Sequence, residues 1–519
     1  MHGSHNFVQT QMYSMLFILV SLFSFLYIFS NKWFNRRSGS SARLPPGPYP
    51  IPIIGSMFKL GNKPHHSLAA LSETYGPLMS LKIGSITTIV VSSREIVQEV
   101  FSKHDMSFSS RTVPYSVNCY TQNQTKNSVI WLPVGDKWRI MRKVLKEQLF
   151  SIRQLDASKE LRKKKVQELL NYVQDCCTNR KAVNINHTAA TATLNVLSNY
   201  IFSADIAHYD STSTEMPFRD IILEIMKLGG TPNLADFFPV FRHLDPNGLV
   251  KKLTPLNQKL MAIFEKHINN KLEERAKRSA DAPSSTNDLT DLLLANIQNE
   301  IPSISLDDMP ILLSDLFIAG SDATSNTLEW AMAELIRNPE KILKAKSELK
   351  ELMGTQDGPI EESYISRLPY LQAVVKETLR LHPPVTFLVP HRTISDVKVR
   401  GYMIPKDAKV LCNVWAMGQD SKVWPKPQMF EPERFLDVNV DYQGQDFELI
   451  PFGTGRRMCP GLPLAHRMLH LMLGSLIHKF DWKIEGGMRP QDMDMTDTFG
   501  FTFTLQKNQP LLALPVKLF

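Results

Sequence analysis

The sequence predicts a mainly helical protein with small β-sheets, preceded by a single N-terminal transmembrane helix. Three observations support this fold class: an apolar run at residues 12–30, helical periodicity from about Trp131 onward, and strand-like alternation at residues 87–93 (TTIVVSS). The chain has 519 residues, of which 43% are hydrophobic and 21% charged, as in a globular protein with a large core. A small disulfide-stapled scaffold is excluded at this length.

Charge and cysteine content indicate which binding partners and which cellular compartment to expect. Lys and Arg outnumber Asp and Glu by 59 to 51, and residues 1–43 hold four of the bases and no acid. Because the rest of the chain is only mildly basic, its composition argues against a nucleic-acid-binding protein. The five cysteines form no CxxC pair, and an odd number cannot all pair internally, so a reducing compartment is expected.

Residues 12–30 are expected to form a membrane anchor. These 19 residues contain no charge and no proline, and at about 1.5 Å per residue they span just under the roughly 30 Å of a bilayer core. Bases follow the run, so the positive-inside rule places the rest of the chain on the cytosolic side. The alternative is a cleaved signal peptide, with glycosylation at the Asn123 and Asn186 sequons.

The remaining chain divides by composition. Residues 44–52 hold five prolines in nine positions, a stiff segment that would separate the anchor from the body. We expect a membrane anchor at residues 1–31, a basic and proline-rich hinge at 32–52, and one globular domain at 53–519. Within that domain, residues 277–288 are predicted to be a polar linker and the basic run at 162–165 a solvated helix face.

The segment 452–461 (FGTGRRMCPG) holds the strongest chemical signal. Cys459 lies just before a helix opened by Pro463, where the helix dipole and Arg457 favour a thiolate. Such a cysteine suits a nucleophile beside a histidine base, or the axial ligand of a haem iron with Phe452 and nearby cations around the haem. A buried structural cysteine in a glycine turn is the plain alternative.

The pattern FxxGxRxCxG in this segment resembles that of cytochrome P-450 monooxygenases, the haem-thiolate superfamily. Other motifs of its membrane-anchored plant members follow in the family's order. The resemblance implies the cytochrome P-450 fold, with Cys459 as axial ligand of the iron of haem b (iron protoporphyrin IX) and Phe452 and Arg457 as haem contacts. It also implies an endoplasmic reticulum membrane location with a single pass and the catalytic domain facing the cytosol.

The same resemblance implies electron delivery from NADPH. The chain has no GxGxxG turn and no flavin-binding region, so the electrons would come through a separate NADPH–cytochrome P-450 reductase carrying FAD and FMN. Cytochrome b5 is a further expected partner, beside membrane lipid. A basic patch on the helix after residue 131 could dock such a partner or could simply face solvent. It is formed by Arg139, Lys143 and Lys146.

A long helix is predicted over residues 306–337. Ser305 and Asp308 form a capping box at its start, and Pro339 stops it. Its middle, residues 319–325 (AGSDATS), is made mostly of Gly, Ser, Thr and Asp, which are poor helix formers, so it either packs against another helix or holds a site.

The resemblance implies that residues 319–325 form the oxygen-binding groove. Gly320 removes a side chain where something must approach, and the Thr324 hydroxyl is expected to bond to the Gly320 carbonyl. Asp322 and Thr324 would be the catalytic residues, delivering protons during oxygen activation. Because Thr324 is present, oxygen activation is expected even though Ala323 stands where the family more often has threonine.

Further residues are assigned by the resemblance to the haem and its supporting core. Trp138 and Arg142, four residues apart on one helix, would hold a propionate by the indole N–H and the guanidinium. His391 would contact the second propionate, at a position where related plant sequences carry arginine. Glu377, Arg380 and Arg434 would form a buried structural triad, of which Glu377 and Arg380 share one helix face.

The expected substrate pocket is apolar, which favours a small hydrophobic substrate. Its candidate residues, each of which could instead be ordinary core, are Val113, Val117, Leu316, Phe317, Ala319, Gly320, Val385, Phe387 and Phe501. The amino-acid sequence of residues 84–93, 319–339 and 455–476 resembles that of the plant subgroup that includes geraniol 8-hydroxylase and ferruginol synthase, which oxidise mono- and diterpenoids. The turn at 499–505 is two residues longer than is common there, which would alter substrate fit.

Three other functions remain open. A sister branch of the subgroup hydroxylates tyrosine, so tyrosine or phenol hydroxylation is an alternative to terpenoid oxidation. A reductase-independent haem-thiolate isomerase or dehydratase would use the same axial cysteine. A membrane-tethered haem binder without turnover is disfavoured, because no proton-delivery group is missing.

Overall fold

The computed structural model describes residues 43–120, 124–210, 218–277, 288–298, 304–354, 358–499 and 504–517, together with Met15, Phe17, Ile18, Ser21 and Phe25. The remainder of the predicted membrane helix, most of the linker at 277–288 and Phe501 lie outside these residues. No helix within the described residues is both long and apolar enough to cross a membrane.

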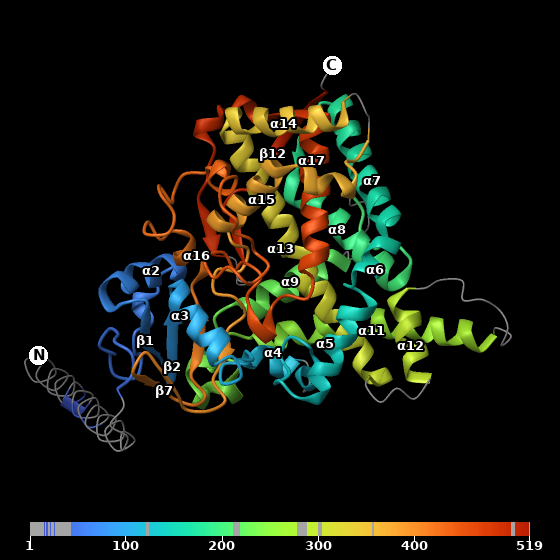
Figure 1. Cartoon of the computed structure of the whole chain (residues 1–519). Coiled ribbons are helices and arrows are strands. Elements are labelled where there is room, and N and C mark those ends of the chain that lie inside the picture. Colours follow the sequence, from blue (N-terminus) through green and yellow to red (C-terminus); the bar gives the residue numbers. More distant parts are fainter. Residues whose placement is uncertain are drawn as a thin grey trace, which may run out of the picture.

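Helices dominate the described chain, as predicted, and the long ones gather around α13 (Met309–Arg337) (Figure 1). α13 packs against α8 (Ile185–Phe202), α15 (Pro369–Leu381) and α17 (Leu462–Lys479). The other helices of more than six residues are α2 (Pro64–Tyr75), α5 (Asp136–Gln148), α7 (Lys159–Thr178), α9 (Phe218–Gly230), α11 (Leu249–Lys277), α12 (Leu289–Gln298) and α14 (Pro339–Met353). Shorter helices are α3 (Arg94–Gln98), α4 (Tyr115–Tyr120), α6 (Ile152–Ala157), α10 (Leu234–Phe237) and α16 (Val414–Gly418).

The ends of α13 follow from its sequence. Ser305 and Asp308 form the predicted capping box, and the first turn after Ser305 is a 3-10 helix, η5 (Leu306–Asp308). α13 continues from Met309 to Arg337 and stops at Asn338, because Pro339 disfavours helical backbone in the residue before it. The predicted span of residues 306–337 is therefore confirmed, with a tighter first turn.

The largest sheet lies beside the helical part, next to α2 and α3 (Figure 1). Its strand order is β1–β2–β8–β5–β3, with β2 and β8 parallel and the other pairs antiparallel. The strands are β1 (Leu78–Ile83), β2 (Ile86–Val91), β8 (Lys409–Cys412), β5 (His391–Arg392) and β3 (Ser110–Arg111). The strand predicted at 87–93 is β2, which ends earlier because Ser93 accepts a hydrogen bond from the Ile96 amide and caps α3.

Three smaller sheets complete the fold. They are β4 (Val183–Asn184) with β12 (Leu512–Lys517) and β9 (Phe480–Ile484); β10 (Asp497–Phe499) with β11 (Leu505–Lys507); and β6 (Val397–Val399) with β7 (Tyr402–Ile404). The C-terminal strands contact α13, since the Trp330 indole donates to the Leu505 carbonyl at 3.2 Å. The Leu511 amide donates to the Glu329 carboxylate at 2.8 Å.

The proline-rich segment is attached to the sheet. Residues 43–50 have no regular structure, and the Pro46 carbonyl accepts from the Ser80 amide of β1 at 2.8 Å. A side chain at Gly47 would collide with the Ser80 carbonyl, 1.8 Å from its ideal Cβ, so only glycine permits this approach. The segment thus lies along β1 and enters the body at a defined place.

One interpretation of the sequence is wrong. The basic run at residues 162–165 is not a uniformly solvated face, because Arg162 and Lys165 of α7 are buried. The Arg162 guanidinium binds Glu362 of the 3-10 helix η6 (Glu362–Arg367) at 2.6 Å. The Lys165 ammonium binds Asp205 at 2.7 Å. Both partners lie far away in the sequence, so local spacing did not reveal them.

Candidate active site

The Cys459 loop folds so that its sulfur meets backbone donors. Gly453 and Gly455 both adopt positive φ, at 74° and 67°, and the Cys459 amide donates to the Phe452 carbonyl at 2.9 Å. The amides of Gly461 and Leu462, at the start of α17, donate to the Cys459 sulfur. Amides at a helix N-terminus stabilise negative charge, so the loop is built to support a thiolate.

The environment of Cys459 suits a metal ligand. Burial raises the pKa of its thiol, and the two amides and the Arg142 guanidinium oppose that rise. Cys459 is exposed, so its sulfur is accessible to a ligand. A metal ion bound there would displace the thiol proton and hold the cysteine as its thiolate.

Three guanidinium groups gather near this cysteine. Burial and repulsion by Arg142 lower the pKa of Arg457 to about 10, although Asp105 opposes this, and burial with repulsion by Arg457 and Arg142 lowers the pKa of Arg111 well below its ordinary value. None of the ion pairs among the described residues involves Arg111, Arg142 or Arg457. Arg111 Nε is buried without a hydrogen-bond partner. This cationic cluster therefore fits a dianionic group such as the two propionates of a haem.

Backbone carbonyls hold the cationic cluster in place. Arg142 donates to the Met458 carbonyl at 2.8 Å, next to Cys459, and Arg457 donates to the Ser109 carbonyl at 2.8 Å. Arg111 donates to the Val389 carbonyl. Each guanidinium keeps further N–H groups for a ligand, because it carries five donors.

The other predicted haem contacts make internal hydrogen bonds. The Trp138 indole N–H donates to the Val129 carbonyl at 3.2 Å, and the Arg457 guanidinium lies 4.7 Å from the centre of its ring. His391 is buried with Nδ1 at 2.7 Å from the Phe108 carbonyl. Burial, reinforced by the charge of Arg111, lowers the pKa of His391, so His391 supplies a neutral imidazole.

Arg111 was not predicted from the sequence as a residue of this site. Arg111 pairs with His391 across β3 and β5, while Arg392, the next residue after His391, is exposed. A strand register cannot be deduced from a two-residue strand. The available signal was an arginine two residues before Val113, in a stretch otherwise expected to face an apolar pocket.

A buried carboxyl on α13 supports the segment that holds Trp138 and Arg457. Ser128 Oγ lies 2.9 and 2.8 Å from the two oxygens of Asp315, and the Ile130 amide is 3.4 Å from one of them. Val129 lies between Ser128 and Ile130, and its carbonyl accepts hydrogen bonds from both Trp138 and Arg457. α13 thus positions the haem-contact residues through Asp315, which the sequence did not single out.

Apart from its last residue, Arg337, α13 opens to solvent in its middle. The helix is otherwise buried over most of its length, but Ala319 is exposed, and Gly320 and Ala323 are half-buried. Ala319 and Ala323 are four residues apart and share one helix face. The small side chains expected for a groove therefore line an accessible stripe.

Two details of this groove differ from expectation. The Thr324 hydroxyl does not bond to the Gly320 carbonyl; instead Ser325 and Thr327 donate to carbonyls of the preceding turn. A side chain at Gly320 would meet Leu197 of α8, whose Cδ1 lies 2.6 Å from the ideal Cβ. What approaches Gly320 is thus a neighbouring helix.

Asp322 is held by the C-terminal strands. Its carboxylate accepts from the Thr504 hydroxyl at 2.9 Å and from the Gln506 amide at 3.4 Å. Burial raises the pKa of Asp322, although these hydrogen bonds and Arg219 oppose the rise. Thr324, two residues along, is buried. Burial thus favours the protonated form of the Asp322 carboxyl. This carboxyl lies two residues before Thr324, which carries the expected catalytic hydroxyl.

The predicted substrate residues differ in their burial. Val385 is half-buried and forms a β-bridge with Thr504, so the two predicted pocket walls meet there. Phe317 and Phe387 are buried in hydrophobic clusters, and Phe317 stacks on Phe264 with ring centres 5.7 Å apart. The remaining described candidates are Val113 and Leu316, packed in the largest cluster, and Val117, also buried there and near Gly229 of α9.

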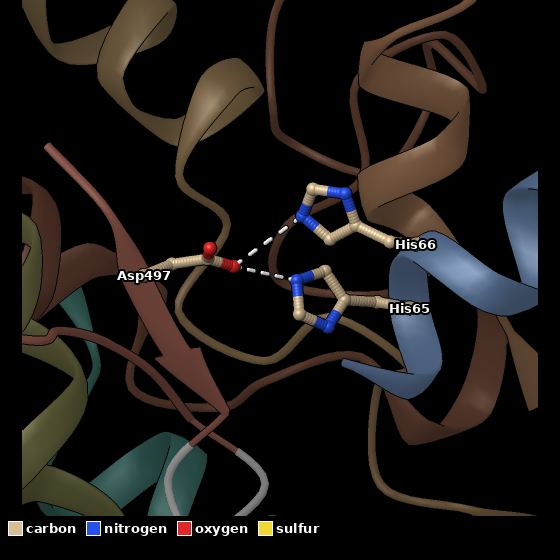
Figure 2. Close-up of side chains that lie close together, drawn as sticks. All are labelled: His65, His66 and Asp497. Carbon is tan, nitrogen blue, oxygen red and sulfur yellow. Dashed lines mark hydrogen bonds and ion pairs between the residues drawn. The ribbon is translucent and has the colours of Figure 1, made fainter. Parts of the chain in front are cut away.

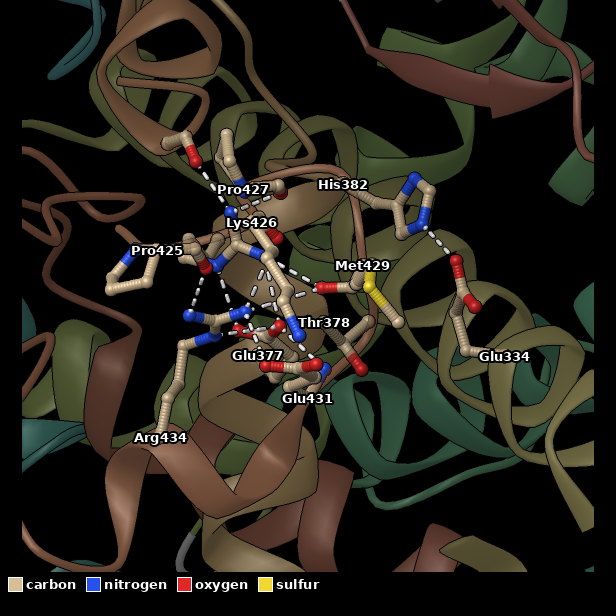
Figure 3. Close-up of polar contacts among 12 residues, drawn as sticks. Glu334, Glu377, Thr378, His382, Pro425, Lys426, Pro427, Met429, Glu431 and Arg434 are labelled. Carbon is tan, nitrogen blue, oxygen red and sulfur yellow. Dashed lines mark hydrogen bonds and ion pairs between the residues drawn. The ribbon is translucent and has the colours of Figure 1, made fainter. Parts of the chain in front are cut away.

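The predicted triad is formed, and Figure 3 shows two of its members, Glu377 and Arg434. Arg380 donates to both Glu377 oxygens at 2.7 and 2.8 Å, and Arg434 donates to Glu377 at 3.0 Å. Arg434 belongs to the 3-10 helix η7 (Pro432–Phe435), so the triad joins η7 to α15. The side chains of Glu377 and Arg380 are fully buried, so the triad is part of the core of the fold.

Comparison with known proteins agrees with this geometry. Residues 45–512 match the cytochrome P450 family. The chain is 47% identical to geraniol 8-hydroxylase of Catharanthus roseus, covering 96% of this chain and 98% of that one. It is 50% identical to cytochrome P450 76T24 of Catharanthus roseus, covering 92% and 94%.

Solved structures share the fold. A zebra fish cytochrome P450 structure with progesterone superimposes with a TM-score of 0.72 at 26% identity, covering 87% of this chain and 99% of that one. The exposed Cys459, together with the cationic cluster, which makes no ion pair within the described residues, fits the haem of such a protein. The chain belongs to the cytochrome P450 family, and it is a monooxygenase that uses a haem cofactor.

Proposed function

We propose that this cytochrome P450 hydroxylates a small hydrophobic terpenoid, a mono- or diterpenoid, using O2 and NADPH. One oxygen atom would enter a C–H bond of the substrate and the other would leave as water, with two electrons and two protons supplied by NADPH and H+. The observation that carries the terpenoid proposal is the 47% identity to geraniol 8-hydroxylase along nearly the whole chain. The accessible alanine-lined stripe of α13 supports an apolar substrate.

Different residues of the chain would bind the haem and supply protons. Haem b, when bound, supplies oxygen activation and C–H oxidation. Cys459 would bind its iron, and Arg111, Arg142 and Arg457 would bind its propionates, with Trp138 and Phe452 packed nearby. Thr324 and Asp322 would supply protons from α13.

Electrons would arrive from a separate flavoprotein reductase, with cytochrome b5 as a second donor. Arg139, Lys143 and Lys146 are all exposed on α5, as docking of an acidic partner requires. Asp136 lies 2.8 Å from Arg139, and Glu147 lies 4.0 Å from Lys143, so part of this charge is compensated locally.

We further propose that the protein is attached to the endoplasmic reticulum membrane by residues 12–30, with the catalytic domain facing the cytosol. Exposed apolar side chains in the described part support contact with lipid. On η4 (Pro239–Leu244), Val240 is 77% and Leu244 71% exposed, and Phe58 on η1 (Met57–Lys59) is 76% exposed. Such residues favour a membrane surface over water.

The experiment is turnover of a panel of mono- and diterpenoids and of tyrosine by the full chain with reductase in microsomes. The proposal expects products that are heavier by one oxygen atom, formed only with NADPH, from at least one terpenoid. Oxidation of tyrosine alone would replace the terpenoid proposal by a phenol hydroxylase. Rearranged products formed without NADPH would instead show an isomerase or dehydratase.

Haem ligation is tested separately. Reduced protein under carbon monoxide is expected to show the red-shifted Soret band of a thiolate-bound haem, and Cys459→Ser is expected to lose it. The band persisting in the serine variant would reject Cys459 as the ligand.

A further inference from the structure

A histidine-rich cluster lies outside the active site (Figure 2). His65 and His66 are neighbours in the first turn of α2, and Asp497 begins β10. His65 Nε2 is 2.7 Å and His66 Nε2 is 3.5 Å from the same carboxylate oxygen of Asp497. One nitrogen or oxygen atom from each of the three residues lies within 4.8 Å of the other two.

We propose that His65, His66 and Asp497 bind one Zn2+ ion. Two imidazole nitrogens and one carboxylate oxygen form a donor set that zinc commonly takes, with a fourth position left to water. Neighbouring helical residues point about 100° apart around the axis, so both rings reach one ion only if it lies beside the first turn. Asp497 lies at that place, facing both rings (Figure 2).

The distances suit this ion after a small movement. Ligand bonds of about 2.0–2.2 Å in a tetrahedron place donor atoms about 3.3–3.6 Å apart. His66 and Asp497 already have this spacing, at 3.5 Å. The hydrogen bond between His65 and Asp497, at 2.7 Å, would lengthen as the ion enters between them.

The surroundings hold the ligands ready. The Trp415 ring packs against both imidazoles, with ring centres 5.2 Å from His65 and 4.1 Å from His66. The His65 side chain is fully buried and that of Asp497 is 13% exposed, so packing holds these two ligands in place.

Lys63 competes with the ion for Asp497. Its ammonium lies 2.5 Å from the other carboxylate oxygen, and its side chain is 40% exposed. A dication would be repelled by the ammonium, yet Lys63 can turn into solvent and leave both oxygens. Removing this charge should therefore strengthen metal binding.

A bound ion would join two distant parts of the chain. It would tie α2 to β10, which pairs with β11, and Gln506 of β11 together with Thr504 holds Asp322 of α13. The zinc site would thus brace the C-terminal hairpin that adjoins the active site.

The test is zinc binding by the full-length, haem-loaded protein, treated with chelator and then titrated with zinc chloride by calorimetry. Wild type is expected to bind one equivalent that His66→Gln and Asp497→Asn both lose. Lys63→Met is expected to bind it about tenfold more tightly. X-ray absorption at the zinc edge should show two imidazoles with oxygen ligands. His65 is left unchanged because it is fully buried.

His243→Gln is the matched control, since His243 is an exposed histidine on η4 away from the cluster. It should retain the equivalent, and every variant should keep the wild-type haem spectrum, which reports folding. Equal zinc binding by wild type, His66→Gln and Asp497→Asn would overturn the proposal. So would unchanged affinity in Lys63→Met with lower thermal stability in Asp497→Asn, because the cluster would then be an ion pair alone.

Discussion

The guanidinium groups of Arg111, Arg142 and Arg457 lie near one another and take part in none of the described ion pairs. Burial opposes all three charges, and repulsion by neighbouring guanidiniums also opposes the charges of Arg111 and Arg457. Without an anion this arrangement costs free energy, and a dianionic cofactor recovers that energy on binding. Single residues of the cluster should therefore affect cofactor retention more than folding.

Arg111→Met is expected to weaken haem binding about 10- to 100-fold, because a hydrogen bond to a charged group contributes about 1.5–3 kcal/mol. The rate of haem transfer to apomyoglobin measures this loss. Arg392→Met is the control, since Arg392 lies in the same β-ladder with its side chain largely exposed. Equal haem loss from both variants would show that the strands, and not the Arg111 charge, retain the cofactor.

Asp315 makes stability depend on pH. Burial raises the pKa of Asp315 from 3.8 to about 7. Between about pH 5 and pH 7 the folded protein keeps this proton while the unfolded chain has lost it, so the folded state binds more protons and stability falls as pH rises. This stabilisation is full below the unfolded pKa and is lost as pH passes the folded pKa.

Asp315→Asn removes this dependence. Relative to wild type, the variant is expected to gain about 2–3 kcal/mol in the free energy of unfolding from about pH 5 to about pH 8. Urea denaturation followed by tryptophan fluorescence at both pH values measures the change. Asp307→Asn, at an exposed carboxyl of η5, should show no such change, and parallel behaviour of the two variants would reject the assignment.

Among the elements, α13 carries most of the functional geometry. Its capping box sets its start, Pro339 sets its end, and its small residues divide between a solvent-accessible stripe and a tight contact with α8. Since a buried helix has neighbours on all sides, small residues in its middle can serve packing and chemistry together. Gly320 serves packing.

Gly320→Ala is expected to destabilise the fold. The new methyl group would lie 2.6 Å from Leu197 Cδ1, and such overpacking costs about 1–3 kcal/mol, reduced by up to about 1 kcal/mol of helix propensity. Thermal unfolding measures the loss. Leu197→Val should relieve it, so the double variant should be more stable than the sum of the two single effects; strict additivity would place the strain elsewhere.

Local patterns in the sequence were sufficient for several elements and residues. The capping box of α13, the Cys459 loop before α17, and the pairing of Glu377 with Arg380 all involve residues within a few positions of one another. The family resemblance added Arg434, which does contact Glu377. These features depend on turn chemistry and helix spacing, which a single sequence displays directly.

Contacts between distant segments could not be predicted in this way. Arg111 joins the cationic cluster through the register of β3 and β5, and Asp322 is held by Thr504, 182 positions later. Arg162 appeared solvated because Glu362, its partner, is 200 positions away. The spacing of these residues in the sequence does not reveal their tertiary contacts. The charge of the run at residues 162–165 was therefore the only guide, and it predicted exposure to solvent.

On the scale of the whole molecule, exposed apolar residues occur near the sheet end of the fold. The Phe237 carbonyl of α10 accepts from Ser85, in the turn between β1 and β2, so η4 lies beside that turn. The proline-rich segment runs along β1. If residues 12–30 cross a membrane, the same end of the molecule would face the lipid.

Leu244→Trp tests this orientation. In vesicles, the added fluorescence of Leu244→Trp over wild type should be quenched by lipids brominated near the headgroups, because interfacial residues lie within about 5–10 Å of the acyl boundary. Leu343→Trp on α14 is the control, since Leu343 is 65% exposed on a helix remote from η4 (Figure 1). Similar quenching of both tryptophans would contradict the proposed orientation.

The attachment of α13 to the C-terminal strands has a consequence for biosynthesis. Asp322 and Glu329 receive donors from Thr504 and Leu511, each 182 residues further along the chain. While the ribosome is still translating that interval, these carboxyls in the middle of the nascent protein have no final partners. A nascent chain that has not reached these strands therefore has an incomplete core, and premature termination near residue 500 is expected to yield a protein prone to degradation.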